Sequence, residues 1–116
     1  MTAPSLDGRR FRAVADVSGG EVTPATIFTY HERDGEIWAC YAGGEIRRGY
    51  LVGTRDGDRL DFRYTQLNTA GETANGHCVS VVRVLPDGRL RLEETWEWES
   101  RPGKGTSVVE EIQQGA

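Results

Sequence analysis

The chain has 116 residues, of which 37% are hydrophobic and 28% charged, and its formal net charge at pH 7 is −4. These values fit one small globular domain over residues 1–116, with no room for a second core. An acidic chain is poorly suited to a nucleic-acid backbone or an anionic membrane, so neither partner is expected.

The first ten residues, MTAPSLDGRR, lack the apolar stretch of a secretory signal. No window approaches the roughly 18 consecutive apolar residues that a membrane span requires. The two cysteines, Cys40 and Cys78, have no CxxC partner, so they indicate no zinc or redox motif. We expect free thiols in a cytoplasmic protein, and a disulfide only if the two strands that carry them meet.

Glycine-containing turn signals punctuate the chain at regular intervals. Glycine accepts a positive φ at no steric cost, and most of the 15 glycines lie in pairs or after aspartate. An Asp-Gly signal favours a three-residue turn with a glycine bulge, whereas Gly43-Gly44 favours a two-residue turn. The seven signals lie at residues 18–20, 33–35, 43–44, 55–57, 69–71, 86–88 and 101–103.

Short segments rich in β-branched and aromatic residues separate these turns. In 89–99, Leu90, Leu92, Glu94, Trp96 and Trp98 alternate with mostly charged residues, which is typical of a strand with one wet face. No segment has a sustained apolar period of 3.6, so no helix longer than a turn is expected. The predicted strands are 9–17, 25–32, 36–42, 45–54, 58–68, 76–85, 89–99 and 105–113.

Eight strands joined by short turns predict an all-β fold, an antiparallel up-and-down meander with a core from about residue 8 to 113. Closing the meander into a barrel removes both exposed edges. Eight-stranded barrels of the streptavidin or lipocalin type are wide enough to hold one small ligand. An open sandwich is the alternative.

Turn type sets which residues face inward. A three-residue turn at 86–88 pairs Val84 with Leu90, Val82 with Leu92, Ser80 with Glu94, and Cys78 with Trp96, and it turns Arg83 and His77 outward. The same turn at 55–57, which we favour there, directs Arg48, Tyr50 and Val52 inward. A two-residue turn would direct Gly49 and Leu51 inward instead.

The predicted inner face therefore has an apolar part and a polar part. Apolar walls with a few placed polar groups are typical of a small-molecule site. The apolar part comprises Leu60, Phe62, Val82, Val84, Leu90 and Leu92. The candidate ligand-binding residues are Arg48, Tyr50, Tyr64, Gln66, Asn68, Ser80, Glu94, Trp96 and Trp98.

Glu94 is the most informative of these residues, because a carboxylate on the apolar face of a strand is seldom buried without a partner. It could anchor a ligand or act as a general acid or base. The structural alternative is a pair with Arg48 or hydrogen bonds to Ser80 and Tyr64. Trp96 and Trp98 could likewise stack on a flat ligand or plug the end of the core.

The outer wall is predicted to expose Phe28, Tyr30 and Trp38, which would make it the interface of a homodimer or homo-oligomer. A different register at 33–35 would place these rings inside. His31 and His77 have no metal-ligand spacing, and no nucleophile elbow or phosphate-binding loop occurs. Neither a metal nor a cofactor is expected.

Five stretches resemble a family of small bacterial β-barrel proteins of the avidin-like or calycin-like kind. They are FTYH (28–31), IWACYAGGEI (37–46), RYTQLN (63–68), GHC (76–78) and LPDGRLRLEETWEW (85–98). The resemblance covers about residues 8 to 112 and implies the barrel. Some members are labelled N-acetylglutamate synthase, but this chain has no room for an α/β acyltransferase core, so no catalytic role is carried over.

The leading hypothesis is a barrel that binds a small molecule of unknown identity. The alternative is a metal-independent isomerase, cyclase or lyase. In that enzyme Glu94 would be the acid or base, and Tyr64 and Arg48 would stabilise developing negative charge.

Overall fold

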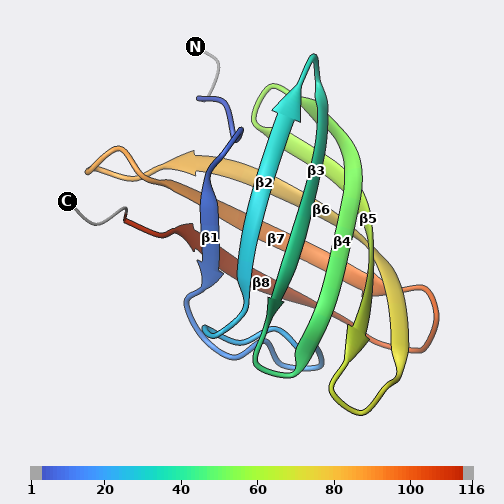
Figure 1. Cartoon of the computed structure of the whole chain (residues 1–116). Coiled ribbons are helices and arrows are strands. Elements are labelled where there is room, and N and C mark those ends of the chain that lie inside the picture. The colour runs from blue at the N-terminus through green and yellow to red at the C-terminus, as the bar shows by residue number, and fades with distance from the viewer. Residues whose placement is uncertain (1–3, 114–116) are drawn as a thin grey trace.

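The strands form a closed antiparallel barrel in which each strand pairs with the next and β8 returns to β1 (Figure 1). The computed structural model describes residues 4–113. This architecture confirms the predicted meander and excludes the open sandwich. The strands are β1 (Arg10–Ala13), β2 (Ile27–Arg33), β3 (Glu36–Gly43), β4 (Ile46–Asp56), β5 (Arg59–Asn68), β6 (Thr73–Val84), β7 (Leu90–Trp98) and β8 (Lys104–Glu111).

The turn between β6 and β7 has the predicted three-residue form. The Leu85 amide donates to the Arg89 carbonyl at 2.8 Å, and Gly88 has a φ of 90°. The pairing of β6 with β7 is therefore the predicted one, with Ser80 opposite Glu94. Val84 is the exception to the predicted inner face, since it lies where the strand leaves the barrel and is 56% exposed.

The turn between β4 and β5 has the two-residue form, so the favoured prediction for 55–57 was wrong. Asp56 pairs with Arg59, and Gly57 takes the first central position of the turn with a φ of 61°. A glycine at that position is the signature of a type II′ turn, whose twist matches that of the strands. The turn lies at 57–58 instead of 55–57, so Thr54 pairs with Asp61 instead of residue 58. This shift by three residues is an odd number, so the side chains from Arg48 to Val52 change face.

This shift corrects the orientation of two candidate site residues. Arg48 and Tyr50 lie on the outer wall, where both are exposed, and Val52 is 66% exposed beside them. Gly49 and Leu51 face the interior instead, as the two-residue alternative required.

The turn between β2 and β3 corrects the predicted outer wall. Asp34 and Gly35 both have a positive φ, as a type I′ turn requires. This two-residue turn sends Phe28 and Tyr30 into the core, so their predicted exposure was wrong. Trp38 does face outward and is 42% exposed. An oligomer interface on this wall stays a prediction, with Trp38 as its one remaining predicted aromatic ring.

One end of the barrel is packed shut. Leu6, from the segment before β1, is fully buried in the same core cluster as Leu60 and Leu90. Glu32 fixes this segment, because its Oε1 accepts from the Leu6 amide at 2.9 Å and from Arg55 at 2.6 Å. No helix able to cross a membrane occurs within residues 4–113.

Three aromatic rings of the interior lie against glycines on the neighbouring strand. A Cβ built on any of these glycines would overlap the ring of its cross-strand partner. Because the glycines have no side chain, the rings lie against the barrel wall instead of filling the centre. This arrangement leaves space in the interior. The pairs are Tyr41 with Gly49, Tyr64 with Gly76, and Trp96 with Gly105.

We predict that Gly49→Ala destabilises the protein by about 1–3 kcal/mol, because the new methyl group must displace the Tyr41 ring from a packed position. Urea denaturation measures the change. The control is Val52→Ala on the exposed face of the same strand, which should lie within about 0.5 kcal/mol of wild type. Equal stability of both variants would contradict the argument.

Candidate functional site

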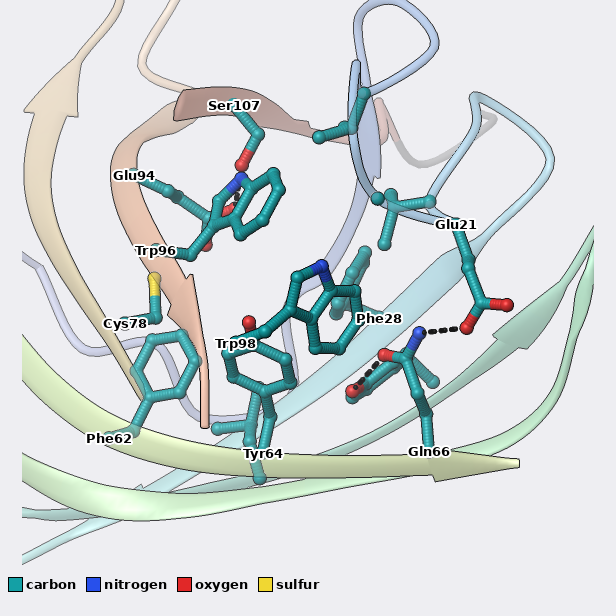
Figure 2. Close-up of a pocket in the computed structure, with 15 residues that line it drawn as sticks. Glu21, Phe28, Phe62, Tyr64, Gln66, Cys78, Glu94, Trp96, Trp98 and Ser107 are labelled. Carbon is teal, nitrogen blue, oxygen red and sulfur yellow. Dashed lines mark hydrogen bonds between the residues drawn. The ribbon is translucent and has the colours of Figure 1, made fainter. Parts of the chain in front are cut away.

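A cavity of about 60 Å³ opens inside the barrel at the end opposite Leu6 (Figure 2). A water molecule needs roughly 10–15 Å³ of such space, so the cavity holds about four or five water-sized groups. Its walls come from the inner faces of β2 to β8 and from the loop between β1 and β2. The lining residues are Val17, Gly20, Glu21, Val22, Phe28, Tyr41, Leu51, Phe62, Tyr64, Gln66, Cys78, Glu94, Trp96, Trp98 and Ser107.

The loop 14–26 covers the cavity and is bonded to the barrel. Within the loop, the Val17 amide donates to the Val22 carbonyl at 3.0 Å. The Trp98 indole Nε1 donates to the Gly19 carbonyl at 3.0 Å, which fixes the loop to β7. These bonds fix the part of the loop that lines the cavity, Val17, Gly20, Glu21 and Val22.

Glu94 projects from β7 into the cavity and has no cationic partner among residues 4–113. Its carboxylate accepts hydrogen bonds from Ser107 Oγ at 2.8 Å and from Ser80 Oγ at 3.3 Å. Burial raises the pKa of Glu94 to about 7, although the two hydroxyl donors act in the opposite direction. Glu94 can therefore gain or lose a proton near neutral pH.

Three tyrosines, on β2, β3 and β5, lie close enough across the barrel to interact with the charge of Glu94. Burial is the main cause that raises the pKa of Tyr30, Tyr41 and Tyr64, and the charge of Glu94 adds to it. All three therefore stay neutral hydrogen-bonding groups. The Tyr30 hydroxyl is fully buried and has no hydrogen-bond partner in the described part of the chain.

A chain of amide and carboxylate hydrogen bonds borders the cavity on the side of β5. Tyr41 Oη donates to Gln66 Oε1 at 2.8 Å, and Gln66 Nε2 donates to Glu21 Oε1 at 2.8 Å. Asn68 Nδ2 donates to the second oxygen of Glu21 at 2.7 Å. This chain fixes the loop carboxylate at the cavity wall and positions the Tyr41 ring.

The remaining walls are aromatic. The Trp96 and Trp98 rings meet edge to face with centroids 5.7 Å apart, and Tyr64 meets Trp98 at 5.6 Å. On the other side, Phe28 stacks on Tyr41 at 4.6 Å. Figure 2 shows the two indoles between Glu94 and Gln66. A molecule in the cavity would therefore meet the faces and edges of aromatic rings, together with the carboxylates of Glu21 and Glu94.

The structure brings together most of the predicted site residues. Tyr64, Gln66, Glu94, Trp96 and Trp98 line the cavity. Asn68 and Ser80 are buried behind this lining, where they hold Glu21 and Glu94 respectively. Arg48 and Tyr50, as described above, lie outside the barrel. Of the alternatives for Glu94, the pair with Arg48 is therefore wrong, and of the two expected hydrogen bonds the one from Ser80 is confirmed. Ser107, and not Tyr64, is the second donor.

Several lining residues were not predicted, for two different reasons. Phe28, Tyr41 and Leu51 would have followed from the two-residue turns at 34–35 and 57–58. Ser107 follows from the register of β8, in which it lies directly opposite Glu94. Glu21 comes from a loop without alternation, so no sequence signal placed it at the site.

The cysteines and the metal-ligating residue types give no further site. Cys78 is buried in the lining and Cys40 is exposed on β3, and both are free thiols, as expected. Burial raises the pKa of Cys78, so its thiol stays protonated. Within residues 4–113, no three His, Cys, Asp or Glu side chains lie together in a way that could hold a metal ion.

Comparison with known proteins gives one family. The model of a family described as avidin-like protein matches residues 4–112, nearly the whole chain. No curated protein and no solved structure gives a significant match. The match confirms the resemblance inferred from the sequence and agrees with the observed barrel.

We predict that Glu94→Gln removes a pH-dependent loss of stability. The folded state binds the Glu94 proton more tightly than the unfolded state, because burial raises the pKa from 4.5 to about 7. The stabilisation is complete below the unfolded value and is lost as the pH rises through the folded one. Between about pH 4.5 and 7, Glu94 should therefore lower the free energy of unfolding by roughly 3 kcal/mol.

Urea denaturation of wild type and variant from about pH 5 to pH 8 measures this effect. The control is Glu93→Gln, because Glu93 faces outward on the same strand and bonds Arg83. The free energy of unfolding of Glu94→Gln should increase relative to that of wild type as the pH rises. The difference between Glu93→Gln and wild type should stay constant with pH. If the free energies of unfolding of wild type and Glu94→Gln change in parallel with pH, the burial argument is contradicted.

Proposed function

Because the chain belongs to the avidin-like protein family, we propose that its barrel binds one small molecule in the cavity beside Glu94. The observation that carries this proposal is a carboxylate that faces a cavity and has hydroxyl donors but no counter-charge. A protein selected for stability alone would fill this position with an apolar side chain. Aromatic walls around a few polar groups are the usual composition of a ligand site.

The arrangement divides the ligand into two parts. A polar group of the ligand faces Glu94, whose hydroxyl donors leave part of its hydrogen-bonding capacity unused. An apolar or flat part lies against Trp96 and Trp98. The size of the cavity favours a ligand of few non-hydrogen atoms.

A thermal-shift panel of small metabolites tests this function. We expect at least one compound to raise the melting temperature of wild type by roughly 5 °C at saturating concentration. The same compound should raise the melting temperature of Glu93→Gln by an equal amount and that of Glu94→Gln by much less. The proposal fails if no compound stabilises wild type, or if the stabilising compound acts equally on Glu94→Gln.

The pKa of Glu94 supports a second candidate, a metal-independent enzyme. A carboxyl with a pKa of about 7 is suited to both giving and taking a proton at neutral pH. Since Arg48 lies outside and the Tyr41 hydroxyl already donates to Gln66, the neutral hydroxyl of Tyr64 would have to stabilise negative charge on a reacting group.

Mass spectrometry of a bound compound before and after incubation separates binding from catalysis. An enzyme converts the compound to a product, and Glu94→Gln then loses turnover by about a hundredfold or more, the usual contribution of one general acid or base. Recovery of the compound unchanged after long incubation excludes the enzyme and leaves the binding proposal intact.

A further inference from the structure

We propose that the cavity selects a small organic cation, an amine or a methylated ammonium, over neutral and anionic molecules of the same shape. This inference rests on the proposed function, because it names the ligand class of the same site. It comes from the charge balance of the lining. The lining contains two carboxylates, Glu21 and Glu94, and no lysine or arginine.

Glu94 provides the first part of the argument. An ionised carboxylate inside a protein is stabilised by a partner of opposite charge, and here only two serine hydroxyls face it. A cationic ligand would supply the missing charge.

The aromatic rings provide the second part. A cation over the face of an aromatic ring gains electrostatic energy from the ring, and rings arranged around a cavity are the usual site for methylated ammonium groups. Trp98 already binds a cation on its outer side, since the Arg101 guanidinium carbon lies 4.3 Å from the ring centre. Six rings line the cavity, those of Phe28, Tyr41, Phe62, Tyr64, Trp96 and Trp98.

Among the polar residues around the cavity, Glu94 is the one whose charge we expect to change when a ligand binds near neutral pH. Glu21, in the covering loop, is already bonded by Gln66 and Asn68. The groups that interact electrostatically with Glu94 from β2, β3, β5 and β6 are Tyr30, Tyr41, Tyr64 and Cys78, and burial raises the pKa of each. Binding of a cation should therefore release a proton from Glu94, and affinity should rise with pH.

Isothermal titration calorimetry with three compounds of matched shape tests the proposal. The compounds are tert-butylammonium, tert-butanol and pivalate, which share the tert-butyl group and differ in charge. We expect tert-butylammonium to bind at least about tenfold more tightly than the other two. Its affinity should rise by roughly tenfold from about pH 6 to pH 8, following the ionisation of Glu94.

Two variants assign the effect to Glu94. Glu94→Gln should bind tert-butylammonium at least about tenfold more weakly and lose the pH dependence, whereas Glu93→Gln on the outer wall should behave as wild type. Circular dichroism of each variant verifies that it is folded.

The outcomes distinguish this inference from the proposed function. Equal or tighter binding of tert-butanol or pivalate overturns the cation proposal and leaves a ligand-binding barrel. Binding of none of the three compounds also overturns it. The proposed function itself then falls only if the wider metabolite panel yields no stabilising compound.

Discussion

The carboxylate of Glu94 is half-buried in the cavity of the barrel with two serine hydroxyls and no counter-charge, and the interpretation of the interior depends on this fact. Transfer of a carboxylate out of water is costly unless it is paired, so the group responds by taking a proton at a higher pH than usual. Glu94 is thus a destabilising residue in a strand whose other inward side chains are apolar. An apolar residue in its place would complete the core, and the cost is understandable if Glu94 meets a ligand.

The room around Glu94 depends on the glycines of the neighbouring strands. A barrel of eight strands encloses just enough space for its own side chains. Here Tyr41 and Trp96 fold against Gly49 and Gly105, which have no side chain to occupy that wall. Leu6 and the paired rings of Phe11 and Tyr30 are fully buried in the same core, and none of them lines the cavity. Large rings opposite glycines thus lie along the wall of the cavity, where they leave space beside Glu94.

The sequence was sufficient for the fold because turn signals and alternation repeat along nearly the whole chain. Glu94 was found by the same alternation, since charge on the apolar face of 89–99 stands out. The registers were less certain, because an Asp-Gly pair fits both two- and three-residue turns and a shift of one residue reverses a strand. For this reason the predicted face was right for β7 and wrong for β4.

Other parts of the site could not be predicted from local patterns. The loop 14–26 has no periodicity, yet it brings Glu21 to Gln66 and closes the cavity. Trp98 fixes that loop through a bond to Gly19 that spans most of the chain. Such long-range contacts depend on barrel closure and not on neighbouring residues. Cytoplasmic location and assembly into oligomers are properties that the fold leaves untested, and they stay predictions.

The most direct test of the central claim is the pKa of Glu94 itself, measured by NMR from the chemical shift of its side-chain carboxyl carbon as a function of pH. Burial without a counter-charge predicts a midpoint of about 7, and in complex with tert-butylammonium a midpoint well below that value. A midpoint near the ordinary value of 4.5 in the free protein would contradict the account, because the carboxylate would then be solvated or paired.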